Sequence, residues 1–254
     1  MPRTPVGLVA AAGIGVVVLG VPVLGLLART PWSDAGRILR ADATLDALRI
    51  SLAAATLAAG LAVALGVPLA WVLARTTVPG RAVLRALALL PLVLPPVVGG
   101  VALLAAFGRR GLLGGALDLP FSFRGVVAAE LFVALPFVVV TVEAGLRQLD
   151  TRYEEAAALL GAGPWTVFRT VTLPLTLPAV GAGAALAWAR ALGEFGATVT
   201  FAGTLPGRTE TLPSAVYVAL EAEPGAALVL SVLLLAIAVA VLFALRGRWL
   251  GAWR

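Results

Sequence analysis

Six long apolar segments dominate this chain of 254 residues. A helix that crosses a membrane needs about 20 consecutive, mostly apolar residues. Six segments are long enough, and they cover 6–28, 50–74, 86–108, 125–146, 177–199 and 225–245. Because lipid cannot satisfy exposed backbone groups, segments of this length are expected to be helices. We therefore predict an all-α integral membrane protein with six transmembrane helices, organised as a single domain over residues 1–254.

Arginine supplies all 19 basic residues, because the chain contains no lysine and no histidine, and it contains no cysteine either. These absences exclude a metal site built on histidine or cysteine, a histidine-dependent triad, a thiol nucleophile and a lysine Schiff base. A Walker A loop also requires lysine, so the chain cannot hydrolyse ATP with a P-loop of its own. Acyl-transfer and redox enzymes are therefore poor candidates.

The net charge of +6 would suggest a nucleic-acid partner in a soluble protein. Here only 13% of the residues are charged, and the arginines lie between apolar runs, as is typical of membrane interfaces. We therefore expect contact with membrane lipid and no nucleic acid. With a cytoplasmic N-terminus, the cytoplasmic segments hold ten arginines and the outer segments eight, which favours cytoplasmic placement of both termini. We expect the first segment to be retained as a helix, since it is long for a signal peptide.

The third apolar segment, 86–108, is irregular. It contains Pro91, Pro95 and Pro96 and then Gly99 and Gly100. Proline removes backbone donors and kinks a helix, and glycine lets another backbone approach. Irregular backbone at membrane depth is tolerated where it is buried in protein or faces a water-filled cavity. The segment is thus a candidate wall of a translocation pathway, with a tightly packed kinked helix as the alternative.

The longest connection, 147–176, contains signals of ordered structure. Thr151 and Glu154 have the spacing of a capping box, which predicts a helix start. Gly161 or Gly163 can end that helix, and Pro164 can open a second short helix that closes at Leu173-Pro174. A capped helix with a small-residue surface suits docking into another protein, and an ordinary interfacial helix is the alternative.

This connection resembles the EAA signature of ATP-binding-cassette importer permeases, in which E-A-A, three residues, G, nine residues and I-x-L-P follow one another. Val171 in place of isoleucine is the single departure. The resemblance implies a coupling helix that docks in a groove of an ATPase subunit. The residues it assigns to coupling are Glu154, Glu155, Ala156, Ala157, Gly161, Val171, Leu173 and Pro174.

The resemblance also implies an assembly. It implies an importer permease fold that works as a homodimer with a second copy of this chain. Its partners would be two ATP-binding-cassette ATPase subunits, which hydrolyse ATP with Mg, and an extracytoplasmic substrate-binding protein. This chain would then be non-catalytic and would bind no metal and no cofactor itself. The expected location is the cytoplasmic (inner) membrane of a bacterium or archaeon.

The fifth apolar segment carries a second resemblance. It reads A-R-A-L-G-E-F-G-A-T over 189–198, followed by F-A-G over 201–203 and P-G-R-T-E-T-L-P over 206–213. This is similar to the molybdate permease branch, and it implies transport of molybdate and also tungstate. Sulfate and thiosulfate permeases share the A-R-A-L-G-E core, so they remain the alternative within the family. An ion-coupled secondary transporter that uses intramembrane carboxylates is the alternative outside it.

Arg190 and Glu194 are four residues apart, which places them on one helix face. Charges within a membrane pair with one another or face water. A structural pair is one reading, with reach to a partner helix across a dimer. The other is that Arg190 guides an oxyanion while Glu194 prevents tight binding. We expect Glu130 and Glu143 to lie near the two membrane interfaces. The predicted pathway residues are Pro95, Pro96, Gly99, Arg190, Glu194 and Thr198.

Overall fold

A computed structural model describes residues 6–114 and 118–250, so residues 1–5, 115–117 and 251–254 of the predicted domain lie outside it. Across the described residues the regular structure is helical, and no strand occurs there. The helices are α1 (Val6–Arg29), α2 (Trp32–Leu39), α3 (Asp42–Arg75), α4 (Arg81–Val93), α5 (Pro96–Phe107), α6 (Phe123–Gln148), α7 (Arg152–Leu159), α8 (Pro164–Val167), the π-helical turn η1 (Phe168–Thr172), α9 (Leu173–Leu192), α10 (Gly196–Ala202), α11 (Leu212–Ala222) and α12 (Pro224–Leu250).

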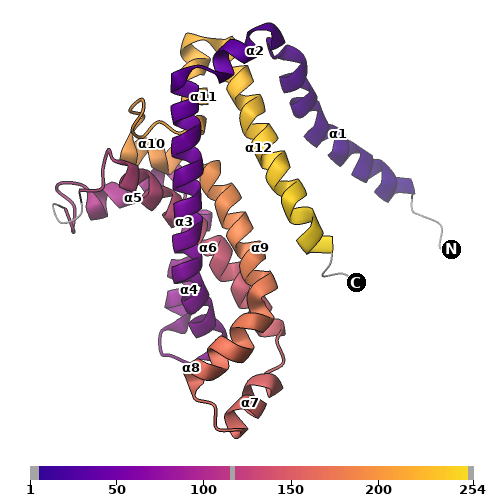
Figure 1. Ribbon diagram of the computed structural model, residues 1–254, viewed down its shortest axis with the longest axis vertical. Coiled ribbons are helices and arrows are strands. Elements are labelled where there is room, and N and C mark those ends of the chain that lie inside the picture. The colour runs from indigo at the N-terminus through magenta and orange to yellow at the C-terminus, as the bar shows by residue number, and fades with distance from the viewer. Residues whose placement is uncertain (1–5, 115–117, 251–254) are drawn as a thin grey trace.

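The core of the molecule is formed by α3, α6 and α9, which pack against one another (Figure 1). Buried positions on α3 recur at helical spacing and are mostly small. Small side chains let helix backbones approach closely, which is how helices associate when lipid removes the hydrophobic driving force between them. Opposite these alanines, α6 contributes buried valines, so the interface alternates small and β-branched side chains. Its central members are Ala54, Ala58, Ala62, Val138 and Val142.

Five helices among the described residues are long and apolar enough to cross a membrane. They are Gly7–Arg29, Asp42–Arg75, Phe123–Gln148, Pro164–Leu192 and Pro224–Val241. The sixth predicted segment, 86–108, does not form one helix. It is divided between α4, which ends at Val93, and α5, which begins at Pro96.

The break between α4 and α5 has a local cause. Leu94 precedes Pro95, and Pro95 precedes Pro96; a residue before proline is driven out of the helical region. Both are extended, with ψ angles of 134° and 135°. Pro96 then occupies the first turn of α5, where its missing N–H costs nothing. The irregular backbone predicted within 86–108 is therefore confirmed, but the segment forms two helices and not one kinked helix, because two successive prolines end one helix and start another.

The predicted fifth helix, 177–199, is also divided. α9 ends at Leu192, and α10 begins at Gly196. At its other end α9 is continuous with η1 and α8, so the short helix predicted to close at Leu173-Pro174 does not close there. The Leu173 N–H donates to the Phe168 carbonyl, five residues back. This widened turn lets the helix run through Pro174, which has no N–H to donate.

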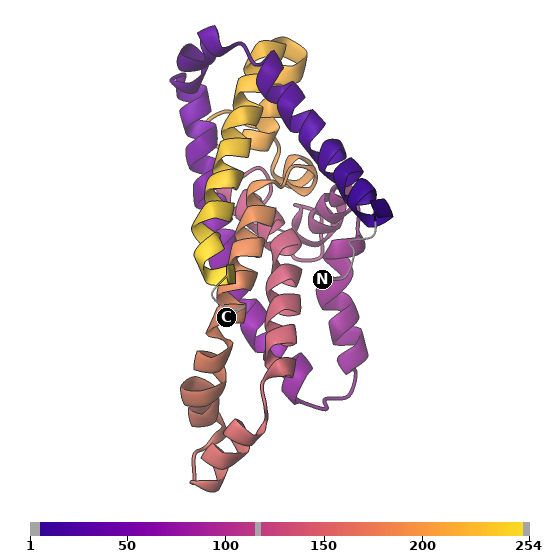
Figure 2. The ribbon, with the colours of Figure 1, turned by 90° about the vertical axis from the view of Figure 1, so that its right-hand side faces the viewer.

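A second group of helices, α1, α2, α11 and α12, packs beside the core. α12 packs on α11 and α2 around a second buried cluster that includes Ile38, Leu212 and Leu230. α1 stands apart from the bundle and touches it mainly at α12 (Figure 2). None of the most apolar part of α1 is buried within the described chain. Its apolar surface must therefore be covered by lipid or by another protein.

The tight contact between α3 and α6 generates a prediction about stability. A Cβ added at Gly66 would lie 2.9 Å from Val138 Cγ1, whereas a Cβ at Gly60, also on α3, meets nothing within 4 Å. Gly66→Val should destabilise the fold by about 1–3 kcal/mol through overpacking. Gly60→Val should be nearly neutral. Thermal unfolding in detergent, followed by tryptophan fluorescence, would measure both, and equal melting temperatures would contradict the packing described.

Candidate functional site

The predicted coupling helix is α7, and its end is defined by Gly161. The Gly161 N–H donates to the Ala158 carbonyl at 2.9 Å, and the Ala162 N–H donates to the Ala157 carbonyl at 3.1 Å. This pair of bonds is a Schellman motif, and it needs a left-handed residue after the helix. Gly161 has φ of +87°, and open space surrounds the position of a Cβ. Gly161 is thus required by the backbone conformation and not by lack of room.

The surface of α7 and its C-terminal turn is open. No residue of α7 is buried, and Glu155 and Ala156 are exposed. Leu159 and Leu160 are 89% and 90% exposed at the end of the helix. Two adjacent leucines this exposed at the end of an ordered helix form an apolar surface patch. This patch makes α7 a candidate docking surface.

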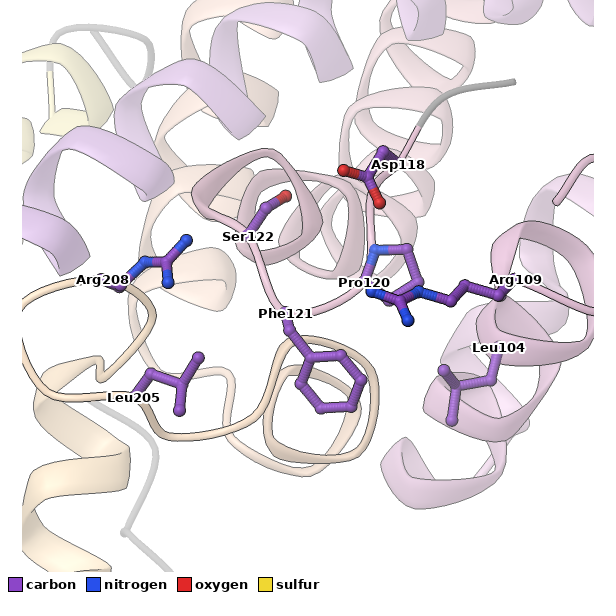
Figure 3. Close-up of a pocket in the computed structure, with 9 residues that line it drawn as sticks. Leu104, Arg109, Asp118, Pro120, Phe121, Ser122, Leu205 and Arg208 are labelled. Atoms are coloured by element: carbon purple, nitrogen blue, oxygen red, sulfur yellow. The ribbon is translucent and has the colours of Figure 1, made fainter. Parts of the chain in front are cut away.

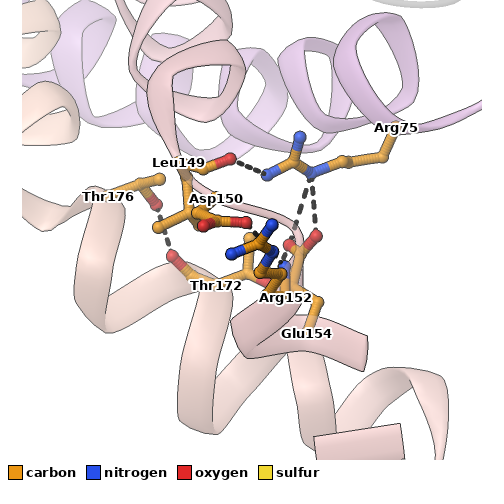
Figure 4. A network of polar contacts seen from close by, with 7 residues as sticks. All are labelled: Arg75, Leu149, Asp150, Arg152, Glu154, Thr172 and Thr176. Carbon is orange, nitrogen blue, oxygen red and sulfur yellow. Dashed lines mark hydrogen bonds and ion pairs between the residues drawn. The ribbon is translucent and has the colours of Figure 1, made fainter. Parts of the chain in front are cut away.

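Glu154 faces away from that surface, toward the end of α3 and toward η1. Its Oε2 lies 3.0 Å from Arg75 Nε at the end of α3. Its Oε1 accepts a hydrogen bond from Thr172 Oγ1 at 2.6 Å (Figure 4). The side chains of Arg75 and Glu154 are only 14% and 17% exposed. Glu154 was predicted to belong with the docking residues; its carboxylate instead joins α7 to α3 and η1.

The predicted capping box at Thr151 is wrong as well. Thr151 has helical backbone angles, and its side chain makes no cap hydrogen bond. Asp150 Oδ1 accepts from the Arg152 N–H at 3.0 Å instead. The helix begins where predicted, but Glu154 is unavailable for a capping box because Arg75 and Thr172 engage it. No local sequence pattern predicts this pairing, because Arg75 and Glu154 are 79 residues apart in the chain.

The second half of the motif lies on the helix that leads into α9. Val171 and Leu173 are half-buried, and Pro174 is exposed. Next to them, the Phe168 ring meets Trp71 of α3 edge-on, with the ring centroids 6.2 Å apart. The loop is therefore attached to α3 by an ion pair and by an aromatic contact.

The two helix breaks lie together, because α5 packs along α10. A Cβ at Gly196 would lie 2.7 Å from Pro96 Cβ, and one at Gly100 would lie 2.6 Å from Thr200 Cβ. The glycines thus allow these short helices to touch. Among the predicted pathway residues, Pro95 and Pro96 are exposed, and Gly99 is buried against Phe132 of α6.

Arg190 and Glu194 form the predicted pair, with Nη2 and Oε2 separated by 2.6 Å. The pair bridges the break after α9 and does not lie within one helix. Glu194 is 1% exposed, and its Oε1 accepts from the Ala197 N–H at 2.7 Å. One carboxylate therefore neutralises Arg190 and satisfies the first turn of α10. The first turn of α10 is the positive end of its helix dipole. A carboxylate at this position is therefore favourable and stabilises the break.

Two further polar groups are buried beside this break. Glu130 is 1% exposed, and its Oε2 has no hydrogen-bond partner among the described residues. Glu130 is thus buried inside the protein, and its position near the outer membrane interface stays a prediction. Thr198 is fully buried, and its Oγ1 is similarly unpartnered in the described structure. Thr198 thus does not line an open surface of this protomer.

Glu143 lies near the other end of α6 and is held by two arginines. Arg85 of α4 donates to its carboxylate, and Arg147 Nη2 lies 2.8 Å away from the same oxygen. Both arginines are more exposed than the glutamate. The arrangement anchors α4 to α6 close to the predicted coupling loop.

The contrast between adjacent glutamates generates a prediction. Glu154→Gln should loosen α7, because Arg75 loses its charged partner, whereas Glu155→Gln changes an exposed side chain. Trypsin should cleave after exposed Arg152 several-fold faster in the Glu154 variant than in the Glu155 variant or the wild type. Equal cleavage rates in all three proteins would show that the ion pair does not hold the loop.

The amino-acid sequence is similar to those of known transport permeases. Over 241 residues the chain is 46% identical to the molybdenum transport system permease protein ModB of Mycobacterium bovis, covering 92% of this chain and 90% of that protein. It is 36% identical to the sulfate transport system permease protein CysT of Escherichia coli over 217 residues, covering 83% of this chain and 78% of that protein.

The fold also matches a solved structure. A bacterial ABC transporter involved in the import of the acidic polysaccharide alginate superposes with a TM-score of 0.74, at 17% identity, over 95% of this chain and 93% of that one. The model of the family described as binding-protein-dependent transport system inner membrane component matches residues 66–251. This chain therefore belongs to that family and is a non-catalytic, multi-pass permease component of an ABC importer.

Proposed function

We propose that this chain forms the membrane pathway of an ATP-driven importer of molybdate, and also of tungstate. The observation that carries the proposal is the 46% identity to a molybdenum permease over most of both chains, against 36% to a sulfate permease. The exposed α7 surface supports the dependence on an ATPase subunit. Both termini and α7 would lie on the cytoplasmic side of the inner membrane.

The engine of this importer would be on other chains. Two ATP-binding-cassette subunits would hydrolyse ATP with Mg, since this chain has no lysine for a Walker A loop. An extracytoplasmic molybdate-binding protein would deliver the anion to the end of the bundle opposite α7. This division leaves alternating access, and not chemistry, to the permease.

A second copy of the chain would complete the pathway. The outer faces of α4 and α5 are apolar and exposed in the single chain, with Val93, Val97 and Val101 more than half exposed. These residues flank the break at Pro95. In a homodimer two such faces would meet, so that the broken helices from both copies enclose the path. α1 would find lipid or the second copy on its uncovered surface.

Motion would pass from the ATPases to the break through α7 and α9. Closure of the ATPase pair would move α7, which the Glu154–Arg75 ion pair attaches to α3. The helix from Pro164 to Leu192 would carry the same movement to the break at Gly193. There Arg190 is already neutralised by Glu194, so a passing oxyanion would be attracted weakly and released readily.

Transport in a reconstituted system tests the proposal. Proteoliposomes that hold the permease with its ATPase should take up labelled molybdate only when ATP and the loaded binding protein are present. Unlabelled tungstate should compete, and sulfate should compete poorly. Uptake of sulfate in preference to molybdate would assign the alternative substrate, and uptake that follows a proton gradient without the ATPase would overturn the importer.

The exposed leucines of α7 generate a separate prediction. Replacing Leu159 and Leu160 together with serine should weaken copurification of the ATPase at least about tenfold, which is about 1.4 kcal/mol. Leu112→Ser is the matched control, because Leu112 is 91% exposed but lies beyond α5. Equal recovery of the ATPase with both variants would contradict docking at α7.

A further inference from the structure

A hollow of about 520 Å³ lies at the end of α6 opposite the coupling loop. Ser122, which caps the start of α6, lines it, while α7 follows the other end of that helix. The rest of the lining comes from the end of α5, the segment before α6 and the loop after α10. The hollow is therefore lined by three segments that lie apart in the sequence.

Two arginines reach this hollow from opposite sides. Arg109 follows α5, and Arg208 belongs to the loop between α10 and α11; in Figure 3 their guanidinium groups point toward one another across the hollow. Neither makes an ion pair with any residue that the structure describes. Both arginines are exposed, and Asp118 is the one acidic side chain among the described residues of the lining, so an anion between the two guanidinium groups would meet a net positive charge.

Both arginines lie in turns that are closed by backbone hydrogen bonds. After α5, the Gly111 N–H donates to the Gly108 carbonyl at 2.7 Å, and a Cβ at Gly114 would lie 2.2 Å from the Gly108 oxygen. Around Arg208, the Leu205 carbonyl accepts from three successive N–H groups, and buried Thr209 Oγ1 accepts from the Leu205 N–H at 3.0 Å. Compact turns of this kind fix the backbone from which each arginine side chain reaches the hollow.

The segment between them is fixed as well. Phe121 has φ of +55°, which is unusual for a bulky residue, and its ring lies against Gly203. Gly203 has φ of +72°, and a Cβ there would lie 3.1 Å from the Phe121 ring. This contact joins the start of α6 to the end of α10, so the hollow is attached to the same broken helix that carries Arg190 and Glu194.

We propose that this hollow is a transit site for a tetrahedral oxyanion dianion, bound by Arg109 and Arg208 before the anion reaches the helix breaks. Guanidinium groups present fixed pairs of donors that match oxyanion geometry. Asp118 also lines the hollow and leaves a formal charge of +1 among these three side chains, which suits brief binding and release. The ligand class rests on the proposed function, because the hollow specifies an anion and the family relationship specifies which one.

The absence of cysteine allows a direct test. Leu205→Cys would place one thiol in the hollow, where the native side chain is 39% exposed. In membrane vesicles holding the full chain, molybdate at ten times its dissociation constant should slow modification by a neutral maleimide about tenfold, as site occupancy requires. Chloride at equal ionic strength should not. A thiol from Leu112→Cys, outside the hollow, should react equally with and without molybdate.

Matched arginine variants decide the outcome. Protection of the Leu205→Cys thiol should disappear with Arg109→Gln and Arg208→Gln together, and it should persist with Arg110→Gln and Arg124→Gln, which remove exposed arginines that do not line the hollow. Protection that survived the first pair would overturn the proposal. Protection that appeared only with the binding protein added, and without free oxyanion, would assign the arginines to a carboxylate of that protein and overturn it too.

The same vesicles separate this site from the transport function. Uptake of an oxyanion without protection of the thiol would remove the transit site and leave the importer standing. Protection without ATP-dependent uptake would do the reverse.

Discussion

Every backbone donor and acceptor within lipid needs a partner, and this requirement shapes the rest of the molecule. Long apolar segments meet it as continuous helices, of which α3 and α6 are the clearest examples. The two interruptions, at Pro95 and at Gly193, are exposed in the single chain, but the short helices that follow them are packed together. α5 and α10 lie against each other, and Glu194 supplies an acceptor to the open first turn of α10.

Small residues make that packing geometrically feasible. The alanine stripe of α3 lets α6 and α9 approach the same helix, and Gly100 and Gly196 let the broken helices touch. Buried charge follows an equally strict pattern at three points. Glu154 pairs with Arg75 and accepts a hydrogen bond from Thr172. Glu143 pairs with two arginines, and Glu194 pairs with Arg190 and accepts a hydrogen bond at the start of α10. Each of these carboxylates joins two elements, so the ion pairs position helices relative to one another.

These joints connect the two ends of the molecule. The loop that carries the EAA motif is attached to α3 by Arg75 and runs without interruption into α9, whose far end is the break beside Arg190. The coupling loop is therefore connected to the break at Gly193 by the helix that runs from Pro164 to Leu192, and to α3 by one ion pair. Glu130 Oε2 and Thr198 Oγ1 are buried next to the break and have no hydrogen-bond partner among the described residues.

The sequence by itself determined the membrane class, the approximate positions of five spanning helices, the ordered loop with its terminating Gly161, and the pairing of Arg190 with Glu194. These features follow from local hydropathy, spacing and turn chemistry, which act over a few residues. Only the tertiary structure decided that the short helices α5 and α10 beside the two breaks pack against each other, that Glu154 turns inward to Arg75, that Glu130 is buried, and that Arg109 and Arg208 share a hollow. Each of these depends on contacts between residues far apart in the chain, whose geometry no local pattern encodes.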